Sequence, residues 1–204
     1  MQSTTMSFSN IHLHGELFAN FFRARRKTFI VQRKWELPED QEMEFDQYDT
    51  PQSRWIAIHD DGDSRVLGGF RLTPTIARCG IYSYMIRDAS LGKLEGGIPH
   101  DLLWGEAPVD PAIWECTRVF VDDDVPQDRR RRLHLRMVEA MMDVARDLGA
   151  EKLVALTDAN WPRWYGRRGL KAEALGPILQ IDDGKFQTVA IDVAASFGSA
   201  ATAA

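Results

Sequence analysis

Two charged residues interrupt one of the most apolar, β-prone runs of the chain. Glu115 and Arg118 lie within Ala112–Val121, where aromatic and aliphatic residues predict a central strand. An ionised group in such a strand must be paired or must bind something, because an isolated buried charge costs several kcal/mol or shifts its pKa. The pair therefore marks a candidate functional site.

Two further groups of residues are of types that bind charged ligands. The first combines Arg25, Phe29 and Trp35 with the acidic stretch Glu44–Asp49, and the second is Arg71 in an apolar run. Arginine binds a carboxylate with two parallel hydrogen bonds, and carboxylates and aromatic faces attract a cation. Both groups could instead be structural, as a solvated acidic loop and as ion pairs within a sheet.

The order and spacing of these residues resemble the LuxI family of autoinducer synthases, whose fold is similar to that of the GNAT acyltransferases. The match runs from about residue 15 to residue 192. It departs from the family at Glu42, where a glycine is usual, and at Cys116. The residues that match are Arg25, Phe29 and Trp35 of R-x-x-x-F-x-x-x-x-x-W, Glu44, Asp46, Tyr48 and Asp49 of E-x-D-x-[FY]-D, the strand arginine Arg71, and Trp114, Glu115, Thr117 and Arg118 of W-E-x-[ST]-R.

The resemblance implies an α/β fold, with a mixed, mostly antiparallel sheet covered by helices. We expect a single domain over residues 1–193 and a flexible tail over 194–204, which is rich in small residues. The implied activity is the synthesis of an N-acyl-L-homoserine lactone, a quorum-sensing signal. The amine of S-adenosylmethionine attacks an acyl thioester, and the methionyl carboxylate then displaces methylthioadenosine. S-adenosylmethionine is a substrate, so no cofactor and no metal are expected.

The resemblance also assigns roles within the site. The amine must be neutral to attack, and a free α-amino group titrates near ~8, so a carboxylate base helps at cytoplasmic pH. Glu115 is the candidate for this catalytic role. Which of the arginines binds the substrate carboxylate stays open. The expected S-adenosylmethionine site consists of Arg25, Phe29, Trp35, Asp46, Asp49, Arg71 and Arg118.

The acyl donor is expected to be an acyl-carrier protein or acyl-CoA. Cations at the start of a helix interact unfavourably with the positive end of the helix dipole, and an acidic carrier bound there would offset this cost. Alternatively, these cations are simply exposed to solvent. Val125–Leu133 lacks the glycine loop with which GNAT transferases hold the pyrophosphate of CoA. The arginines expected to dock the carrier are Arg129, Arg130, Arg132 and Arg136.

The same resemblance places the acyl chain against the strand Lys152–Thr157 and the preceding helix. Ala155 stands where relatives that prefer 3-oxo chains often carry a threonine. A buried 3-oxo oxygen would here lose a hydrogen bond worth about 0.5–1.5 kcal/mol, so we expect a preference for chains without it. The expected lining of the acyl pocket is Thr117, Val138, Met141, Ala155 and Trp161.

Hydrophobic periodicity predicts the elements that position these residues. Interleaved helices, strands and hairpins agree with a mixed sheet. The predicted elements are a helix at Gly15–Phe29, a loop at Val31–Thr50, a hairpin of Arg54–His59 and Val66–Leu72, a strand at Ala112–Val121, a helix at Arg130–Leu148, a strand at Lys152–Thr157, a short helix at Asn160–Arg168, and a hairpin of Pro177–Ile181 and Gln187–Val193.

Composition narrows the possible partners. The net charge of −5 argues against nucleic acid. Two cysteines, Cys79 and Cys116, fit a reduced protein, and neither a secretory signal nor a membrane span is visible. We therefore expect a cytoplasmic protein, and we expect it to be a monomer. Two other functions stay open: a GNAT-type N-acyltransferase that acts on another amine or amino acid, and a non-catalytic protein that binds the same ligands.

Overall fold

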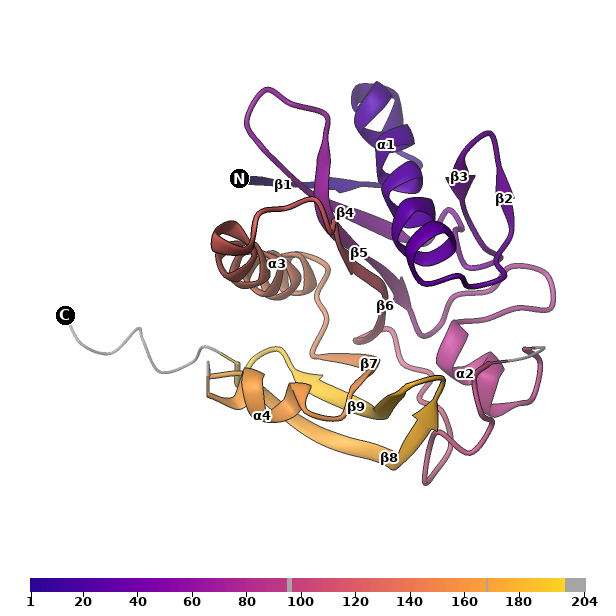
Figure 1. The fold of residues 1–204 in the computed structure, drawn as a ribbon. Coiled ribbons are helices and arrows are strands. Elements are labelled where there is room, and N and C mark those ends of the chain that lie inside the picture. Colours follow the sequence, from indigo (N-terminus) through magenta and orange to yellow (C-terminus); the bar gives the residue numbers. More distant parts are fainter. Residues whose placement is uncertain (95–96, 168, 197–204) are drawn as a thin grey trace. The chain divides into compact units, whose positions relative to one another are not determined.

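Strands hydrogen-bonded side by side organise both of the compact units into which the chain divides (Figure 1). The computed structural model describes residues 1–94, 97–167 and 169–196. The first unit contains Met1–Leu72 and Arg118–Val144, and the second contains Thr73–Thr117 and Ala145–Ala204. Each unit is described here by itself.

The sheet of the first unit starts with a strand that periodicity did not predict. β1 (Gln2–Met6) pairs antiparallel with β4 (Arg54–His59), and β4 pairs antiparallel with β5 (Val66–Pro74). The strand order in this unit is β1-β4-β5-β6, where β6 is Ile113–Val121. The sequence QSTTM of β1 carries only one large apolar residue, so no hydrophobic alternation marks it. The predicted β4–β5 hairpin is confirmed.

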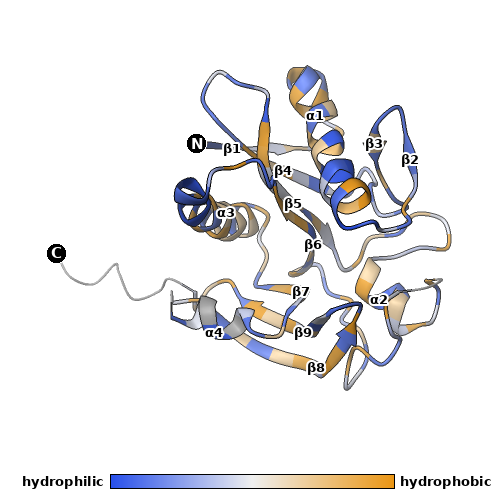
Figure 2. Ribbon diagram, viewed as in Figure 1, coloured by the Kyte–Doolittle hydropathy of each residue, from blue (hydrophilic) through white to orange (hydrophobic). Residues whose placement is uncertain are grey.

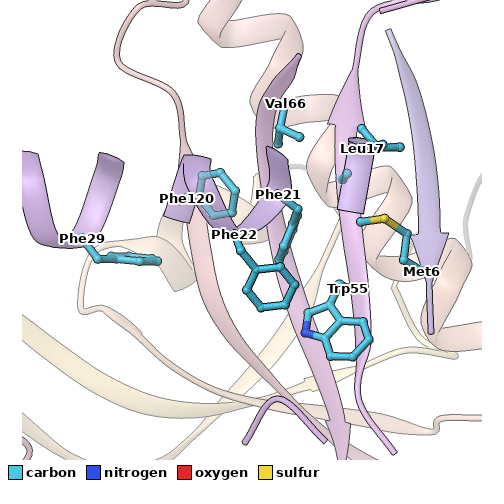
Figure 3. Close-up of a cluster of buried hydrophobic side chains, with 9 residues drawn as sticks. Met6, Leu17, Phe21, Phe22, Phe29, Trp55, Val66 and Phe120 are labelled. Carbon is cyan, nitrogen blue, oxygen red and sulfur yellow. The ribbon is translucent and has the colours of Figure 1, made fainter. Parts of the chain in front are cut away.

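One long helical segment packs against this sheet. α1 (Gly15–Arg26) continues into a π-helical turn at Lys27–Gln32, so the predicted helix is confirmed but ends in a different geometry. Gly69 on β5 permits the close approach of α1, because a Cβ there would lie 2.6 Å from the ring of Phe21. The resulting core is drawn in Figure 3, and its buried members are Met6, Leu17, Phe21, Phe22, Phe29, Trp55, Ala57, Val66 and Phe120.

The segment predicted as a loop contains a small hairpin. β2 (Glu39–Asp40) pairs antiparallel with β3 (Met43–Glu44) through a turn in which Gln41 and Glu42 have positive φ. A glycine tolerates such a φ best, so Glu42 takes a strained conformation at the position where the family has glycine. The remainder of the segment is irregular and leads into β4.

The helix α3 (Gln127–Asp147) confirms the prediction for this part of the chain and begins three residues before the predicted start. Its first turns are hydrophilic (Figure 2). Gly149, with a φ of +71°, follows its end, as expected for a glycine that terminates a helix. In the part of the chain that the structure describes, no helix combines the length and the apolar character needed to cross a membrane.

The second unit contains the strand order β6-β7-β9-β8. β7 (Lys152–Asp158) is parallel to β6, and the pairs β7–β9 and β8–β9 are antiparallel. These pairings confirm an α/β fold with a mixed, mostly antiparallel sheet. The other elements are β8 (Lys171–Ile181), β9 (Gly184–Asp192), α2 (Met85–Ser90) and α4 (Trp161–Gly166).

The segment predicted as a flexible tail begins in an ordered turn. Ala194–Ser196 follow β9, and Ser196 is buried while its hydroxyl bonds the carbonyl of Asp192. Residues 197–204 lie outside the described part of the chain. The predicted flexible tail therefore stays a prediction for residues 197–204 only.

Candidate active site

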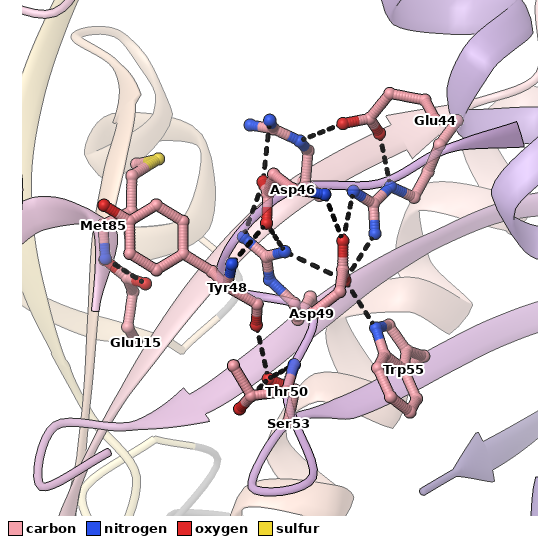
Figure 4. Close-up of polar contacts among 12 residues, drawn as sticks. Glu44, Asp46, Tyr48, Asp49, Thr50, Ser53, Trp55, Met85 and Glu115 are labelled. Carbon is pink, nitrogen blue, oxygen red and sulfur yellow. Dashed lines mark hydrogen bonds and ion pairs between the residues drawn. The ribbon is translucent and has the colours of Figure 1, made fainter. Parts of the chain in front are cut away.

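Three arginines and three carboxylates form a closed ring of alternating charges in the first unit (Figure 4). The ring unites five predicted substrate-binding residues with Glu44, which the sequence supplied only as a motif position. Its net charge is zero when all six groups are ionised. In order around the ring, the members are Arg25, Glu44, Arg118, Asp46, Arg71 and Asp49.

Arg25 connects two of the carboxylates from the end of α1. Its Nε donates to Oε2 of Glu44 at 2.6 Å, and its Nη1 and Nη2 donate to the two oxygens of Asp49 at 2.8 and 2.9 Å. Two parallel hydrogen bonds to one carboxylate fix both partners in a plane. All three nitrogens of Arg25 are therefore engaged inside the ring.

Arg71 and Arg118 complete the ring from neighbouring strands. Arg71 on β5 donates from Nη1 to Oδ1 of Asp46 at 2.5 Å, and the same nitrogen lies 2.9 Å from Oδ1 of Asp49. Arg118 on β6 reaches Oδ2 of Asp46 at 2.8 Å through Nη2 and Oε1 of Glu44 at 3.3 Å through Nε. Arg118 has a φ of +51°, which a non-glycine residue rarely adopts, so its two ion pairs hold a strained backbone.

The spacing of the E-x-D-x-Y-D motif results from a tight turn. Asp46 accepts the backbone N–H of Tyr48 at 2.8 Å, and Asp49 accepts that of Asp46 at 2.8 Å. The indole Nε1 of Trp55 donates to Asp49 at 2.7 Å, which positions this carboxylate from β4. Each aspartate thus both shapes the turn and faces an arginine, and shifting either by one position would break both functions.

Burial and pairing together decide the charge state of the ring. Burial by itself raises the pKa of the Asp46 and Asp49 carboxyls, but the adjacent guanidinium groups of Arg71, Arg118 and Arg25 hold both pKa values below their ordinary range. Burial likewise disfavours the charged form of Arg71, yet Asp46 and Asp49 raise its pKa. All three groups therefore stay ionised at neutral pH, which makes both aspartates poor bases.

An aromatic pair lies beside the ring. Phe29 and Trp35 are stacked, with their centroids 5.3 Å apart and an interplanar angle of 9°. The guanidinium carbon of Arg118 lies 5.5 Å from the Phe29 centroid. A second cation, Arg33, lies 5.4 Å from the Phe29 centroid and 5.3 Å from that of Trp35. All seven residues expected to bind S-adenosylmethionine thus lie together, and the pair already attracts cations.

Glu115 is held in a different way, in the second unit. It is fully buried on β6, and its Oε2 accepts the backbone N–H of Met85 at 3.1 Å (Figure 4). Its Oε1 accepts the backbone N–H of Ile86 at 2.7 Å. These donors belong to the first turn of α2, so Glu115 caps that helix from a neighbouring strand. Burial raises the pKa of the Tyr84 phenol, and the nearby Glu115 raises it further.

The residues expected to line the acyl pocket fall into both units. Val138 and Met141 are buried on α3 in the first unit. In the second unit, Thr117 and Ala155 are buried and Trp161 is half-buried. The register pairs Trp114 with Leu153 and Glu115 with Val154, so strand alternation puts Ala155 on the face of Trp114 and Thr117 on the face of Glu115. The shared pocket stays a prediction.

The arginines expected to dock a carrier have partners within the chain. Arg129 donates to both oxygens of Asp60 at 2.7 and 2.9 Å. Arg130 bonds the backbone carbonyls of Asp123 and Val125, and Arg136 bonds the hydroxyl of Ser3 at 2.9 Å. Arg132 is exposed. Residues of the same chain therefore stabilise part of the positive charge at the start of α3. The sequence alone could not predict these partners.

Sequence reasoning missed two residues of this site. Glu44 occupies two arginines at once, and its place at the head of the E-x-D-x-Y-D motif was the signal that could have added it to the site. Arg33 belongs to no motif, and nothing in its sequence neighbourhood indicated that it would lie against the aromatic pair. Among the described residues, no group of three or more His, Cys, Asp or Glu side chains could hold a metal ion.

The fold and this site define a class of protein and then a family within it. An acyl-CoA N-acyltransferase from Pseudomonas aeruginosa has the same fold, with a TM-score of 0.60 at 15% identity over 93% of this chain and 99% of that one. The chain is thus a GNAT-like acyltransferase in fold. The family model for autoinducer synthases matches residues 9–197, and the chain belongs to this family.

Two relatives illustrate the similarity. An acyl-homoserine-lactone synthase from Ralstonia nicotianae is 28% identical over 176 residues, which cover 84% of this chain and 80% of the relative. The structure of BjaI, a CoA-dependent acyl-homoserine lactone synthase with S-adenosylmethionine and isopentyl-CoA, matches with a TM-score of 0.74 and 26% identity. That match covers 93% of this chain and 82% of BjaI.

Proposed function

We propose that this protein makes an N-acyl-L-homoserine lactone from S-adenosylmethionine and an acyl thioester. The observation that carries the proposal is the closed charge ring beside a cation-binding aromatic pair, in a chain of the autoinducer synthase family. S-adenosylmethionine presents a sulfonium cation, an amine and a carboxylate, and the site offers a group suited to each.

The sulfonium binds against Phe29 and Trp35. Each aromatic face attracts a cation by about 0.5–2 kcal/mol, and two guanidinium groups already lie at such positions. Because Asp46 and Asp49 are neutralised by arginines, they act on the sulfonium mainly by shaping the pocket and less as free counter-ions. This departs from the simpler expectation that the two aspartates attract the sulfonium directly.

Arg118 is the arginine that binds the substrate carboxylate. Arg25 and Arg71 are completely buried in the ring, whereas the Arg118 side chain is 11% exposed. Its Nε and Nη2 face Glu44 and Asp46, and its Nη1 makes no hydrogen bond to a residue in the described ranges. The Nη1 of this fixed guanidinium can therefore donate to a small anion.

Glu115 is the general base. The substrate nitrogen gives its proton to the carboxylate as it attacks the thioester carbonyl carbon, and the thiolate leaves. The methionyl carboxylate oxygen then attacks the γ-carbon, whose bond to the sulfonium sulfur breaks to release neutral methylthioadenosine. The two backbone N–H groups fix the orientation of Glu115.

The acyl donor is an acyl-carrier protein that approaches the start of α3. Support comes from the exposed Arg132 and from the partly exposed Arg129, Arg130 and Arg136. Replacing Arg130 and Arg132 with Glu should raise the KM for the carrier substrate and flatten its salt dependence, while the KM for S-adenosylmethionine stays constant. An unchanged carrier KM would leave acyl-CoA, the donor that BjaI takes, as the proposed substrate.

The chain that is transferred lies against Ala155 on β7 and Trp161 on α4, both in the second unit. Ala155 offers no hydrogen-bond donor to a 3-oxo group, so unsubstituted acyl chains are preferred. The reaction takes place in the cytoplasm, which agrees with the two free cysteines of the chain, Cys79 and Cys116. The protein acts as a monomer of one domain over residues 1–193.

The proposal is tested by incubating the purified protein with S-adenosylmethionine and a mixture of acyl-carrier and acyl-CoA donors, half of them 3-oxo. Mass spectrometry should detect acyl-homoserine lactone, with unsubstituted chains in excess. Products dominated by 3-oxo lactone would contradict the proposed chain preference and leave the proposed reaction unaffected. Acylation of another amine, with no lactone formed, would favour an ordinary N-acyltransferase and contradict the proposal.

A further inference from the structure

Arg33 is a cation at the aromatic pair that no carboxylate holds. Within residues 1–94, 97–167 and 169–196, its side chain has no salt bridge and no hydrogen bond, and its contacts are the rings of Phe29 and Trp35. Its guanidinium carbon lies 5.4 Å from the Phe29 centroid and 5.3 Å from the Trp35 centroid, so it is within cation–π distance of both rings. Arg118 also faces Phe29, but two carboxylates bind it.

The backbone fixes Arg33 while its side chain stays free to move. Its N–H donates to the carbonyl of Thr28 at 3.1 Å, and the N–H of Trp35 donates to that of Phe29 at 3.0 Å. Between them, Lys34 has a φ of +60°, which returns the chain toward the rings. The residue as a whole is exposed, and the attraction of the rings for its guanidinium is a weak interaction at such a site.

We propose that Arg33 occupies the cation position of the Phe29–Trp35 pair in the free protein, and that the substrate sulfonium replaces it. This inference rests on the proposed function, because it takes S-adenosylmethionine as the ligand. The cations of the ring cannot leave, since each is bound to two carboxylates, whereas Arg33 can exchange.

Such an exchange makes Arg33 a specificity-determining residue. A ligand with a positive sulfur competes with Arg33 for the rings, whereas a ligand with a neutral thioether cannot repay the loss of the Arg33 contact. The thioether product of the reaction is neutral, so Arg33 returns to the rings once methylthioadenosine has formed. Arg33 therefore weakens the binding of substrate and assists the departure of product.

The test compares two ligands that differ by one methyl group and one charge. Calorimetry would give the affinities of S-adenosylmethionine and of S-adenosylhomocysteine, its neutral thioether analogue, for the wild type and for Arg33→Gln and Arg33→Lys. Arg26→Gln is the matched control, because Arg26 ends the preceding helix α1, pairs with Glu39 and makes no cation–π contact within the described residues.

Arg33→Gln should tighten S-adenosylmethionine roughly two- to fivefold relative to S-adenosylhomocysteine, as expected from the loss of one exposed cation–π competitor. Arg33→Lys should lie between this variant and the wild type, and Arg26→Gln should leave the ratio of the two affinities unchanged. A wild-type ratio in Arg33→Gln would overturn the inference alone. A wild type that binds neither ligand would overturn the proposed function and this inference with it.

Discussion

Asp46 and Asp49 in the first unit and Glu115 in the second are buried carboxylates that accept hydrogen bonds from different kinds of donor. Asp46 and Asp49 each face two guanidinium groups, whereas Glu115 accepts hydrogen bonds from the neutral backbone N–H groups of Met85 and Ile86. Cationic neighbours lower the pKa of both aspartates, which therefore remain anions and do not take up protons at neutral pH.

This difference suggests different functions: the carboxylates of the ring position other groups, and Glu115 transfers a proton. The ring of three arginines and three carboxylates lies beside the aromatic pair and holds the guanidinium of Arg118 in place. Two backbone N–H groups orient Glu115, and its place in the W-E-x-[ST]-R motif is the reason that the proposed proton transfer is assigned to it. Three predictions break or sharpen this contrast.

The largest effect is expected from removing one ring arginine. Arg71→Met leaves Asp46 and Asp49 with one counter-ion fewer in a buried site, and should lower the free energy of unfolding by about 3–5 kcal/mol, measured by urea denaturation. Arg26→Gln, which removes a partly exposed ion pair with Glu39, should cost about 1 kcal/mol or less. An equal loss of unfolding free energy in Arg71→Met and Arg26→Gln would contradict the prediction that the ring stabilises the fold as a buried network.

Replacing Glu115 should affect both turnover and stability. Glu115→Gln should lower turnover roughly 10²–10⁴-fold at pH 7, and the deficit should shrink above about pH 8, where the substrate amine loses its proton unaided. The amide also loses one acceptor for the start of α2, which costs about 1–3 kcal/mol of stability.

Asp88→Asn separates these two effects. Asp88 accepts the backbone N–H of Ser83 at 2.7 Å beside the same helix start, so its loss should destabilise α2, and any loss of turnover relative to the wild type should be the same at every pH. A Glu115→Gln deficit that is the same at every pH, or no larger than that of Asp88→Asn, would leave Glu115 with a structural function only.

The smallest effect is a change in the pH dependence of stability. Because the folded pKa values of Asp46 and Asp49 lie below the unfolded value of about 3.9, their contribution is complete above that pH and is lost as the pH falls through the folded values. In Arg71→Met the carboxylates bind protons more readily. The stability gap between wild type and Arg71→Met, measured by denaturation at pH 7 and at pH 4, should therefore narrow at the lower pH.

Periodicity predicted the elements better than their contacts. The helix of α1, the β4–β5 hairpin, β6, α3 and β7 were predicted because their apolar residues recur at regular spacing. β1 was missed because its residues are small and polar, and its strand conformation depends on pairing with β4.

The site could be predicted as a set of residues but not as a network. The motifs brought Arg25, Asp46, Asp49 and Arg71 to one place, while the choice of partner for each arginine depends on distances that only the folded chain sets. The same limit explains why the sequence predicted an acidic carrier protein as the partner of Arg129. Its partner Asp60 is 69 residues away in the sequence, in the turn between two strands.

The ratio of methylthioadenosine to acylated product, measured in one reaction with S-adenosylmethionine and an acyl donor, tests the proposed function most directly. Acylation and ring closure on one substrate predict one methylthioadenosine for each acylated molecule, with the product at the mass of the lactone. An acylated S-adenosylmethionine that accumulates without methylthioadenosine, or an acylated product of another amine, would contradict the account.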